Sequence, residues 1–155
     1  MQIVSIVTLL HLLGFAAFVG AAFAQQALLR MSARDGVAVA VRDEYERLAA
    51  GILTKAEVPA LFVQVVTGVA FIADAPGFLR QHWLHAKLTA VVVLLVVSHL
   101  EMFNARRIVK ARAARGDAAN DEIAERKKRH AAMGVVERVL VAAILLLVTV
   151  LRGAF

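Results

Sequence analysis

Four long apolar segments alternate with charged ones along the chain, and this pattern predicts the main elements. The apolar segments run over about residues 3–29, 52–73, 83–103 and 135–151. A membrane-spanning helix needs about 20 mostly apolar residues, a length that each segment reaches or approaches. We therefore expect an all-α protein, an integral membrane four-helix bundle that forms one membrane domain over residues 1–155.

Three polar connections separate these segments. Residues 31–48 are charged, and Val39 to Leu48 fit a short amphipathic helix lying along the membrane surface. Residues 74–81 are few and contain Pro76 and Gly77, a turn signal. Residues 104–130 are heavily basic, and we expect them to form a loop.

The first apolar segment is predicted to remain in the protein as a helix. A secretory signal peptide has a positively charged start and a short apolar core. Residues 1–29 carry no charge and are too long for such a core. We therefore expect a first transmembrane helix rather than a cleaved signal.

Composition supports a membrane protein and excludes some cofactors. The chain is 61% hydrophobic and 19% charged, whereas soluble domains are about half apolar and about a quarter charged. With no cysteine, it has no disulfide, thiolate metal site or iron–sulfur cluster. The net charge of +6 comes from basic residues flanking apolar segments, which favours anionic lipid over nucleic acid as the partner.

The distribution of Lys and Arg predicts the orientation. Fourteen lie in or beside the connections that follow the first and third segments: Arg30, Arg34, Arg42, Arg47, Lys55, Arg106, Arg107, Lys110, Arg112, Arg115, Arg126, Lys127, Lys128 and Arg129. The opposite side has two, Arg80 and Arg152. Because cytoplasmic loops are rich in Lys and Arg, both termini should lie outside, with the 104–130 loop in the cytoplasm of a multi-pass bacterial inner membrane protein.

Histidines in the apolar segments are the candidate functional groups. Polar ionisable side chains are costly at membrane depth and usually have a partner or a function there. With the predicted boundaries, His11 lies about 6 Å to the outer side of its helix centre. His85 lies about 9–12 Å to the outer side and His99 about 9–12 Å to the inner side. His11 and His85 are therefore expected at similar depths, and His99 is not.

A b-type haem would suit the pair formed by His11 and His85. Haem in a helical bundle takes axial nitrogen ligands from facing helices, and its propionates take basic partners. Lys87, Arg80 or Trp83 would serve the propionates.

Each of these groups also has a simpler structural interpretation. His82 suits a solvated rim, His85 and Lys87 can extend toward the interface, and His99 beside Glu101 fits a polar helix end. The remaining polar and small residues predict contacts between helices. Gln64 and Thr67 are expected to form interhelical hydrogen bonds, and Glu137 and Arg138 to form ion pairs with Glu101 or Arg106. Gly14, Gly20 and Gly68 would allow close helix approach or leave room for a macrocycle.

The residues also resemble a known family. The similar stretches are TLLH ending at His11, YERL over 45–48 leading through Pro59 to Thr67 and Gly68, WLHAKL over 83–88 followed by His99, and Glu137–Arg138 before the final aliphatic run. They cover nearly the whole chain, and the WLHAKL stretch is the specific one. In them the chain resembles the HemJ-type protoporphyrinogen IX oxidases of the CopD-like four-helix membrane superfamily.

The resemblance implies a haem b protein that removes electrons and protons from protoporphyrinogen. His11, His85 and Lys87 would then be essential, and Trp83 and His99 would support them. The substrate would be a porphyrin, and a membrane acceptor such as a quinone would receive the electrons.

Two other functions fit the same pattern. One is a non-enzymatic subunit that carries haem, or only helices, within a larger electron-transfer or transport complex, or as a homo-oligomer. The other is a CopD-type copper protein using His82 and His85 at the outer surface. Copper sites there would recruit methionine, but Met31, Met102 and Met133 avoid the outer rim, which disfavours copper.

Overall fold

The protein is nearly all helical in the computed structural model, which describes residues 2–150 and the side chains of residues 6–150. The elements are α1 (Gln2–Ser32), α2 (Val39–Ile52), η1 (Leu53–Glu57), α3 (Val58–Asp74), η2 (Pro76–Arg80), α4 (His82–Arg115), η3 (Gly116–Ala119) and α5 (Asn120–Thr149). The predicted all-α class is confirmed for this part of the chain.

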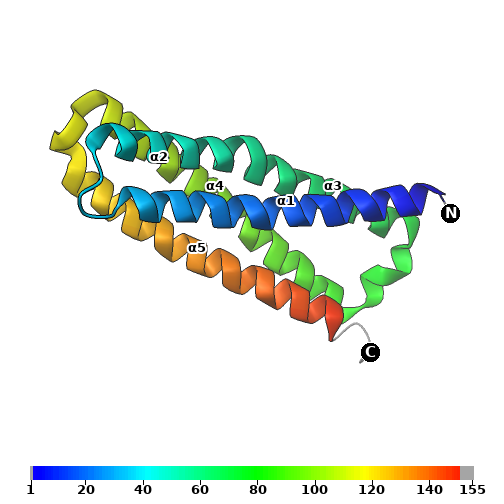
Figure 1. The fold of residues 1–155 in the computed structure, drawn as a ribbon. Helices are drawn as coiled ribbons and strands as arrows, with labels where there is room; N and C mark the ends of the chain where they lie inside the picture. Colours follow the sequence, from blue (N-terminus) through cyan, green and yellow to red (C-terminus); the bar gives the residue numbers. More distant parts are fainter. Residues whose placement is uncertain (1, 151–155) are drawn as a thin grey trace.

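The helices form two antiparallel hairpins. One pairs α1 with the rod made by α2, η1 and α3, and the other pairs α4 with α5. The hairpins pack together mainly where α2 meets α4. Figure 1 shows α1 and α5 close together near η3 and separating toward the end that carries the N-terminus. The fold therefore has a joined end and an open end.

Three stretches of the described residues are long and apolar enough to cross a membrane, judged by length and composition. They are Ile6–Ser32, Val39–Asp74 and His82–Thr149, and the last contains both α4 and α5. Large apolar side chains on their outer faces are exposed, for example Leu12, Phe62 and Val139. Such a surface suits lipid and would be unfavourable in water.

The basic segment 104–130, predicted as a loop, is helical almost throughout. It contains the end of α4, the short η3 turn and the first part of α5. Its charges are compatible with helices because Glu122 and Arg126 form an i,i+4 ion pair of 2.8 Å. Its apolar residues are also buried between the two helices, where Ile108 of α4 packs in one cluster with Ile123 of α5. The third and fourth predicted helices are therefore longer than expected.

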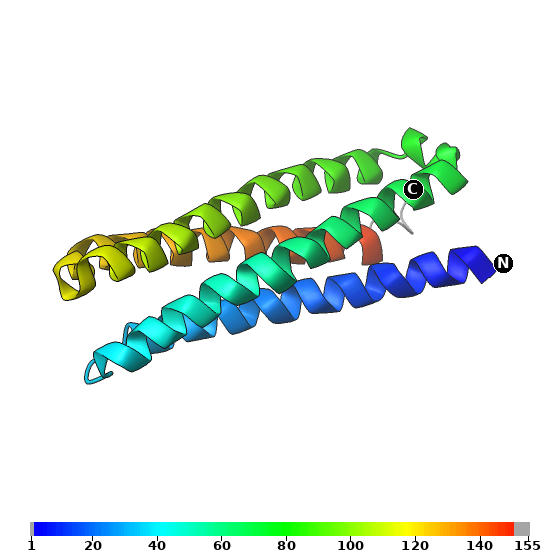
Figure 2. The same cartoon turned by 90° about the horizontal axis from the view of Figure 1, so that it is seen from above.

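The second helix differs from the prediction in the same way. Instead of a helix over 52–73 preceded by a separate surface helix, α2 and α3 form one continuous rod (Figure 2). Its middle is the π-helical turn η1, in which the Val58 N–H donates to the Leu53 carbonyl. Pro59 follows directly, and its ring excludes a regular α-helical turn over residue 55. The proline therefore widens the helix without ending it.

A small core connects the two hairpins. Phe18 of α1, Ala60 and Leu61 of α3 and Leu94 of α4 are buried together. Most other apolar side chains lie at least partly on the outside. Few apolar contacts therefore hold the two hairpins together, and buried polar groups make up much of the rest of the contact between them.

Candidate functional site

Three buried carboxylates meet between the hairpins. Glu57 comes from η1, Glu101 from α4 and Glu137 from α5. One carboxylate oxygen from each lies within 4.8 Å of the others, and all three residues are at most 1% exposed. Within the π-helical turn η1, Glu57 and Leu53, four residues earlier, are the buried residues. Such turns often occur at functional sites.

Residues of α1 and α5 complete this group. The Gln26 Nε2 donates to Glu101 Oε1 at 3.3 Å and to the His130 carbonyl at 3.4 Å. The His130 Nε2–H donates to Gln25 Oε1 at 2.8 Å. We call these six buried residues, drawn from all four helical rods, the polar layer: Gln25, Gln26, Glu57, Glu101, His130 and Glu137.

Most carboxylate oxygens of the polar layer lack a hydrogen bond of normal geometry in the described part of the chain. Both oxygens of Glu57, both of Glu137 and Glu101 Oε2 are buried without a hydrogen bond of normal geometry in the described part of the chain. Arg138 acts electrostatically on Glu101 and Glu137, although no ion pair within 4.0 Å joins it to either. The predicted ion pairs of Glu137 and Arg138 with Glu101 or Arg106 are therefore wrong: Glu137 lies beside Glu101, a residue of the same kind. Buried carboxylates at this separation require a proton or a cation.

His11 lies outside the polar layer, in the contact between α1 and α3. Its Nδ1 is 2.7 Å from Thr67 Oγ1, and its ring packs edge-on against Phe71. The Thr67 hydroxyl donates to the Val63 carbonyl at 2.6 Å, so it accepts the His11 Nδ1–H. His11 Nε2 therefore keeps its lone pair. Gln64 donates to the His11 carbonyl, and the predicted interhelical hydrogen bonds of Gln64 and Thr67 are thus confirmed.

The other predicted site residues lie on α4 at the open end. His85 is exposed, and its Nε2–H donates to the Leu79 carbonyl at 2.8 Å. Trp83 is buried and donates to the Gln81 side chain. Lys87 is half-buried and within electrostatic range of His11. His82 is exposed, as expected of a rim residue.

The hydrogen bond between Gln26 and Glu101 allows the levels of the histidines to be compared. α1 and α4 run in the same direction (Figure 1). His11 precedes Gln26 by 15 residues, or about 22 Å along α1. His85 precedes Glu101 by 16 residues, or about 24 Å along α4. His11 and His85 therefore lie at nearly the same level.

His99 lies at the level of the polar layer, far from His11. Its Nδ1–H donates to the Leu95 carbonyl at 2.7 Å, and the side chain is exposed on the outer face of α4. Two residues separate it from Glu101, which is about 3 Å along the helix. The structure therefore does not bring His99 to His11 or His85.

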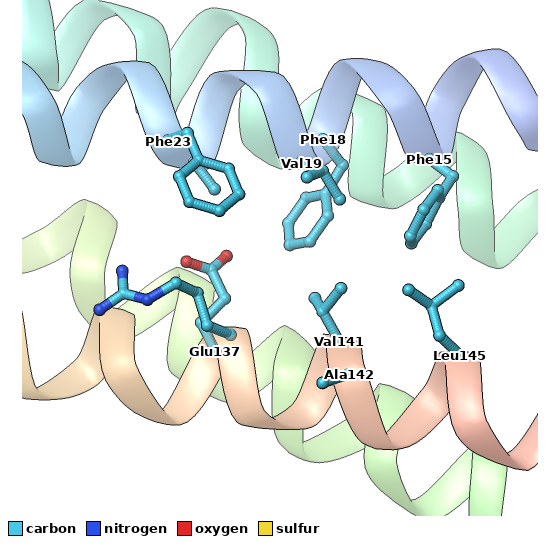
Figure 3. Close-up of a pocket in the computed structure, with 10 residues that line it drawn as sticks. Phe15, Phe18, Val19, Phe23, Glu137, Val141, Ala142 and Leu145 are labelled. Carbon is cyan, nitrogen blue, oxygen red and sulfur yellow. The ribbon is translucent and has the colours of Figure 1, made fainter.

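An apolar cavity of ≈ 270 Å³ extends from the polar layer between α1 and α5. Figure 3 shows Phe15, Phe18 and Phe23 of α1 facing Val141 and Leu145 of α5, with Glu137 near one end. The cavity therefore connects an apolar lining to a buried carboxylate.

A second polar group holds the joined end together. The Arg112 side chain of α4 donates to both oxygens of Glu46 of α2, each at 3.2 Å. Lys127 of α5 lies 2.6 Å from the same carboxylate. Glu46 belongs to the YERL stretch noted in the sequence, and here its contacts are structural ones between three helices.

The polar layer was only partly visible in the sequence. Glu101 and Glu137 stood out as charges at the ends of apolar segments. Glu57 lay unremarked within the segment 52–73, and His130 fell at the end of the predicted loop 104–130. Both residues could be recognised as buried because each lies on the same helix face as other inward-facing residues. This can be seen only once the helices are known to extend past the apolar segments.

Comparison with known proteins agrees with a membrane location. Residues 5–152 match the model of a family described as predicted integral membrane protein (DUF2269). No curated protein and no solved structure matches the chain. Because the matched residues cover nearly the whole chain, the protein belongs to this family of predicted integral membrane proteins.

Proposed function

We propose that the protein is a haem b-binding membrane oxidoreductase that resembles the HemJ-type protoporphyrinogen IX oxidases. The observation that carries this proposal is the common level of His11 and His85 on α1 and α4, at the open end of the fold. Lys87, within electrostatic range of His11, supplies a cation there for a haem propionate or a substrate carboxylate. We assign His11 and Lys87 as the catalytic residues, with Trp83 in support.

The two histidines fit an axial ligand to different extents. His11 has the arrangement common to metal-bound imidazoles, with Nδ1–H held by Thr67 and Nε2 available. His85 uses Nε2 on the Leu79 carbonyl, so ligation through that atom requires it to exchange this hydrogen bond. His99 is at the wrong level to replace either one. Bound haem would supply one-electron chemistry between a porphyrin substrate and a membrane acceptor such as a quinone.

The proposed arrangement in the membrane has four spanning helices. α1, the α2–α3 rod, α4 and α5 would cross the bacterial inner membrane as a single membrane domain, with both termini outside. The positive charges near α2, the end of α4 and the start of α5 support this orientation. The joined end would then face the cytoplasm, and the open end with His11 and His85 would face outward.

A subunit of a larger complex, or of a homo-oligomer, is the second candidate. The observation that favours it is the set of polar side chains exposed on one side of α4, namely His82, His85, Thr89 and His99. Polar groups facing lipid are costly, and a second chain could cover them. In this case the chain carries haem or only helices and has no catalysis of its own.

An absorption spectrum of the detergent-purified protein, produced with ample haem, tests the proposal. We expect split α and β bands on reduction, which His11→Ala and His85→Ala should each abolish. His82→Ala, which removes an exposed histidine from the same helix, is the matched control and should keep them. A colourless protein would contradict haem binding.

Growth then distinguishes an enzyme from a subunit. The gene should restore haem synthesis in a strain that lacks its own protoporphyrinogen oxidase. Absence of rescue by a protein that retains haem would favour the subunit.

A further inference from the structure

The carboxylates of the polar layer have a geometry that suits a metal ion. We propose that Glu57, Glu101 and Glu137 bind one divalent cation of the hard, oxygen-preferring class, of about the size of Ca²⁺. This site is separate from the proposed haem site and does not depend on it, because it lies about 22 Å along α1 from His11. It also uses none of the histidines proposed as ligands.

The distances between the oxygens leave room for one ion. Three oxygens within 4.8 Å of one another lie at most about 2.8 Å from a common centre, and Ca²⁺ takes carboxylate oxygens at about 2.3–2.6 Å in a flexible arrangement. Mg²⁺ requires strict octahedral geometry, which three side chains from three separate helices meet less readily. Oxygen-only ligands disfavour zinc and copper.

A further buried group points to a ligand at the same place. The Ser98 hydroxyl of α4 is 0% exposed and has no hydrogen bond in the described part of the chain. It precedes Glu101 by three residues and so shares its helix face. Unsatisfied buried polar atoms are rare, and the Ser98 oxygen is of the type that a hard cation or its bound water takes as a partner. The Gln25 amide of α1, also 0% exposed, acts on Glu57 as a hydrogen-bond donor.

The local charges agree with a divalent ion. Three ionised carboxylates carry a charge of −3, and Arg138, which acts on Glu101 and Glu137, contributes +1. A divalent cation would bring the sum to zero. The neighbouring cations Arg112 and Lys127 do not contribute, because Glu46 and Asp43 already compensate them.

A polar cleft opens beside the polar layer. It has a volume of ≈ 550 Å³ and lies at the joined end of the fold. Gln26 and His130 of the polar layer line it, together with two acidic residues, Asp35 and Asp121, and five basic ones, Arg30, Arg42, Arg112, Lys127 and Lys128. The three carboxylates do not line it, so the cleft gives water access to the edge of the polar layer and not to the carboxylates themselves.

Metal binding by the full chain in detergent tests this proposal. After treatment with a chelator, the protein is titrated with Mn²⁺, monitored by electron paramagnetic resonance, and with Ca²⁺ in competition. We expect one ion per chain, with affinity reduced at least tenfold in Glu57→Gln and Glu137→Gln. Glu125→Gln, which neutralises an exposed carboxylate of α5, should bind as the unaltered protein does.

Thermal unfolding is a second measurement, which distinguishes lost metal binding from poor folding of a variant. Ca²⁺ should raise the Tm of the unaltered protein. Without metal, Glu57→Gln should have the higher Tm because it relieves repulsion, and Ca²⁺ should not raise it further. The haem content of Glu57→Gln should equal that of the unaltered protein. If no ion binds, or if Glu125→Gln loses binding as Glu57→Gln does, the proposal is wrong, and protons neutralise the carboxylates.

Discussion

At the scale of single residues, the buried charges of the joined end depend on one carboxylate. Glu46 is 2% exposed and faces both Arg112, itself 6% exposed, and Lys127. A buried ion pair adds little net stability, but removing one partner leaves an uncompensated charge. The position of Glu46 is therefore less tolerant of change than its neighbours on α2.

Replacing Glu46 by Gln should destabilise the protein. We expect a loss of about 3 kcal/mol in the free energy of unfolding, at the lower end for a broken buried pair, because Asp43 still faces Arg112 at 3.1 Å. Denaturant unfolding in detergent measures it. The matched control is Glu44→Gln, two residues away in an exposed pair with Arg47, where the change should be below about 1 kcal/mol. Equal effects of the two changes would contradict this account.

At the scale of helices, the Gln26 side chain of α1 packs directly against Gly134 of α5. A β-carbon on Gly134 would lie 2.7 Å from Gln26 Cδ, which is too close for the Gln26 side chain to remain in place. Gln26 holds α1 to α4 and α5 through its bonds to Glu101 and the His130 carbonyl. The polar layer therefore requires a glycine at position 134, because any larger residue would displace Gln26.

Gly134→Ala should displace Gln26 and weaken the contact between the hairpins. We expect a loss of about 1–3 kcal/mol in the free energy of unfolding, from unsatisfied buried polar groups and overpacking. Gly20→Ala is the control, since nothing lies within 4 Å of a β-carbon there. The same unfolding assay should show it to be neutral or slightly stabilising, because alanine favours a helix. A larger loss at Gly20 than at Gly134 would refute the explanation.

The extent of the helices shows what the sequence could and could not predict. The apolar parts of α1, α3, α4 and α5 were predictable because lipid-facing side chains must be apolar over about 20 residues. The extensions of α4 and α5 were not, because Arg126 and its neighbours are stabilised by local ion pairs and by burial of Ile108 and Ile123. A prediction from mean hydropathy alone assigns those charged residues to a loop.

The site was less predictable than the helices. The common level of His11 and His85 follows from counting residues along two parallel helices, and the register set by Gln26 and Glu101 agrees with that count. The meeting of Glu57 with Glu101 does not follow from counting. It depends on the rotation of three helices and on a π-helical turn whose only sequence signal was Pro59.

At the scale of the whole molecule, the absence of cysteine makes the topology directly measurable. Single cysteines introduced at Gly77 in η2 and Asp117 in η3 lie at opposite ends of the fold. A membrane-impermeant maleimide applied to cells with a permeabilised outer membrane should label Gly77→Cys at once. Asp117→Cys should be labelled only after the inner membrane is opened. The unaltered chain has no thiol and is the control. The reverse pattern would place the termini in the cytoplasm.

The joined and open ends of the fold also have a mechanical consequence. The two hairpins pack mainly at the end where Glu46, Arg112 and Lys127 meet, and His11 lies about 22 Å along α1 from the polar layer. A small change in the angle between the hairpins is therefore amplified into a larger displacement between His11 and His85. Such a change alters the width of the open end while every helix and the ion pairs of the joined end stay intact.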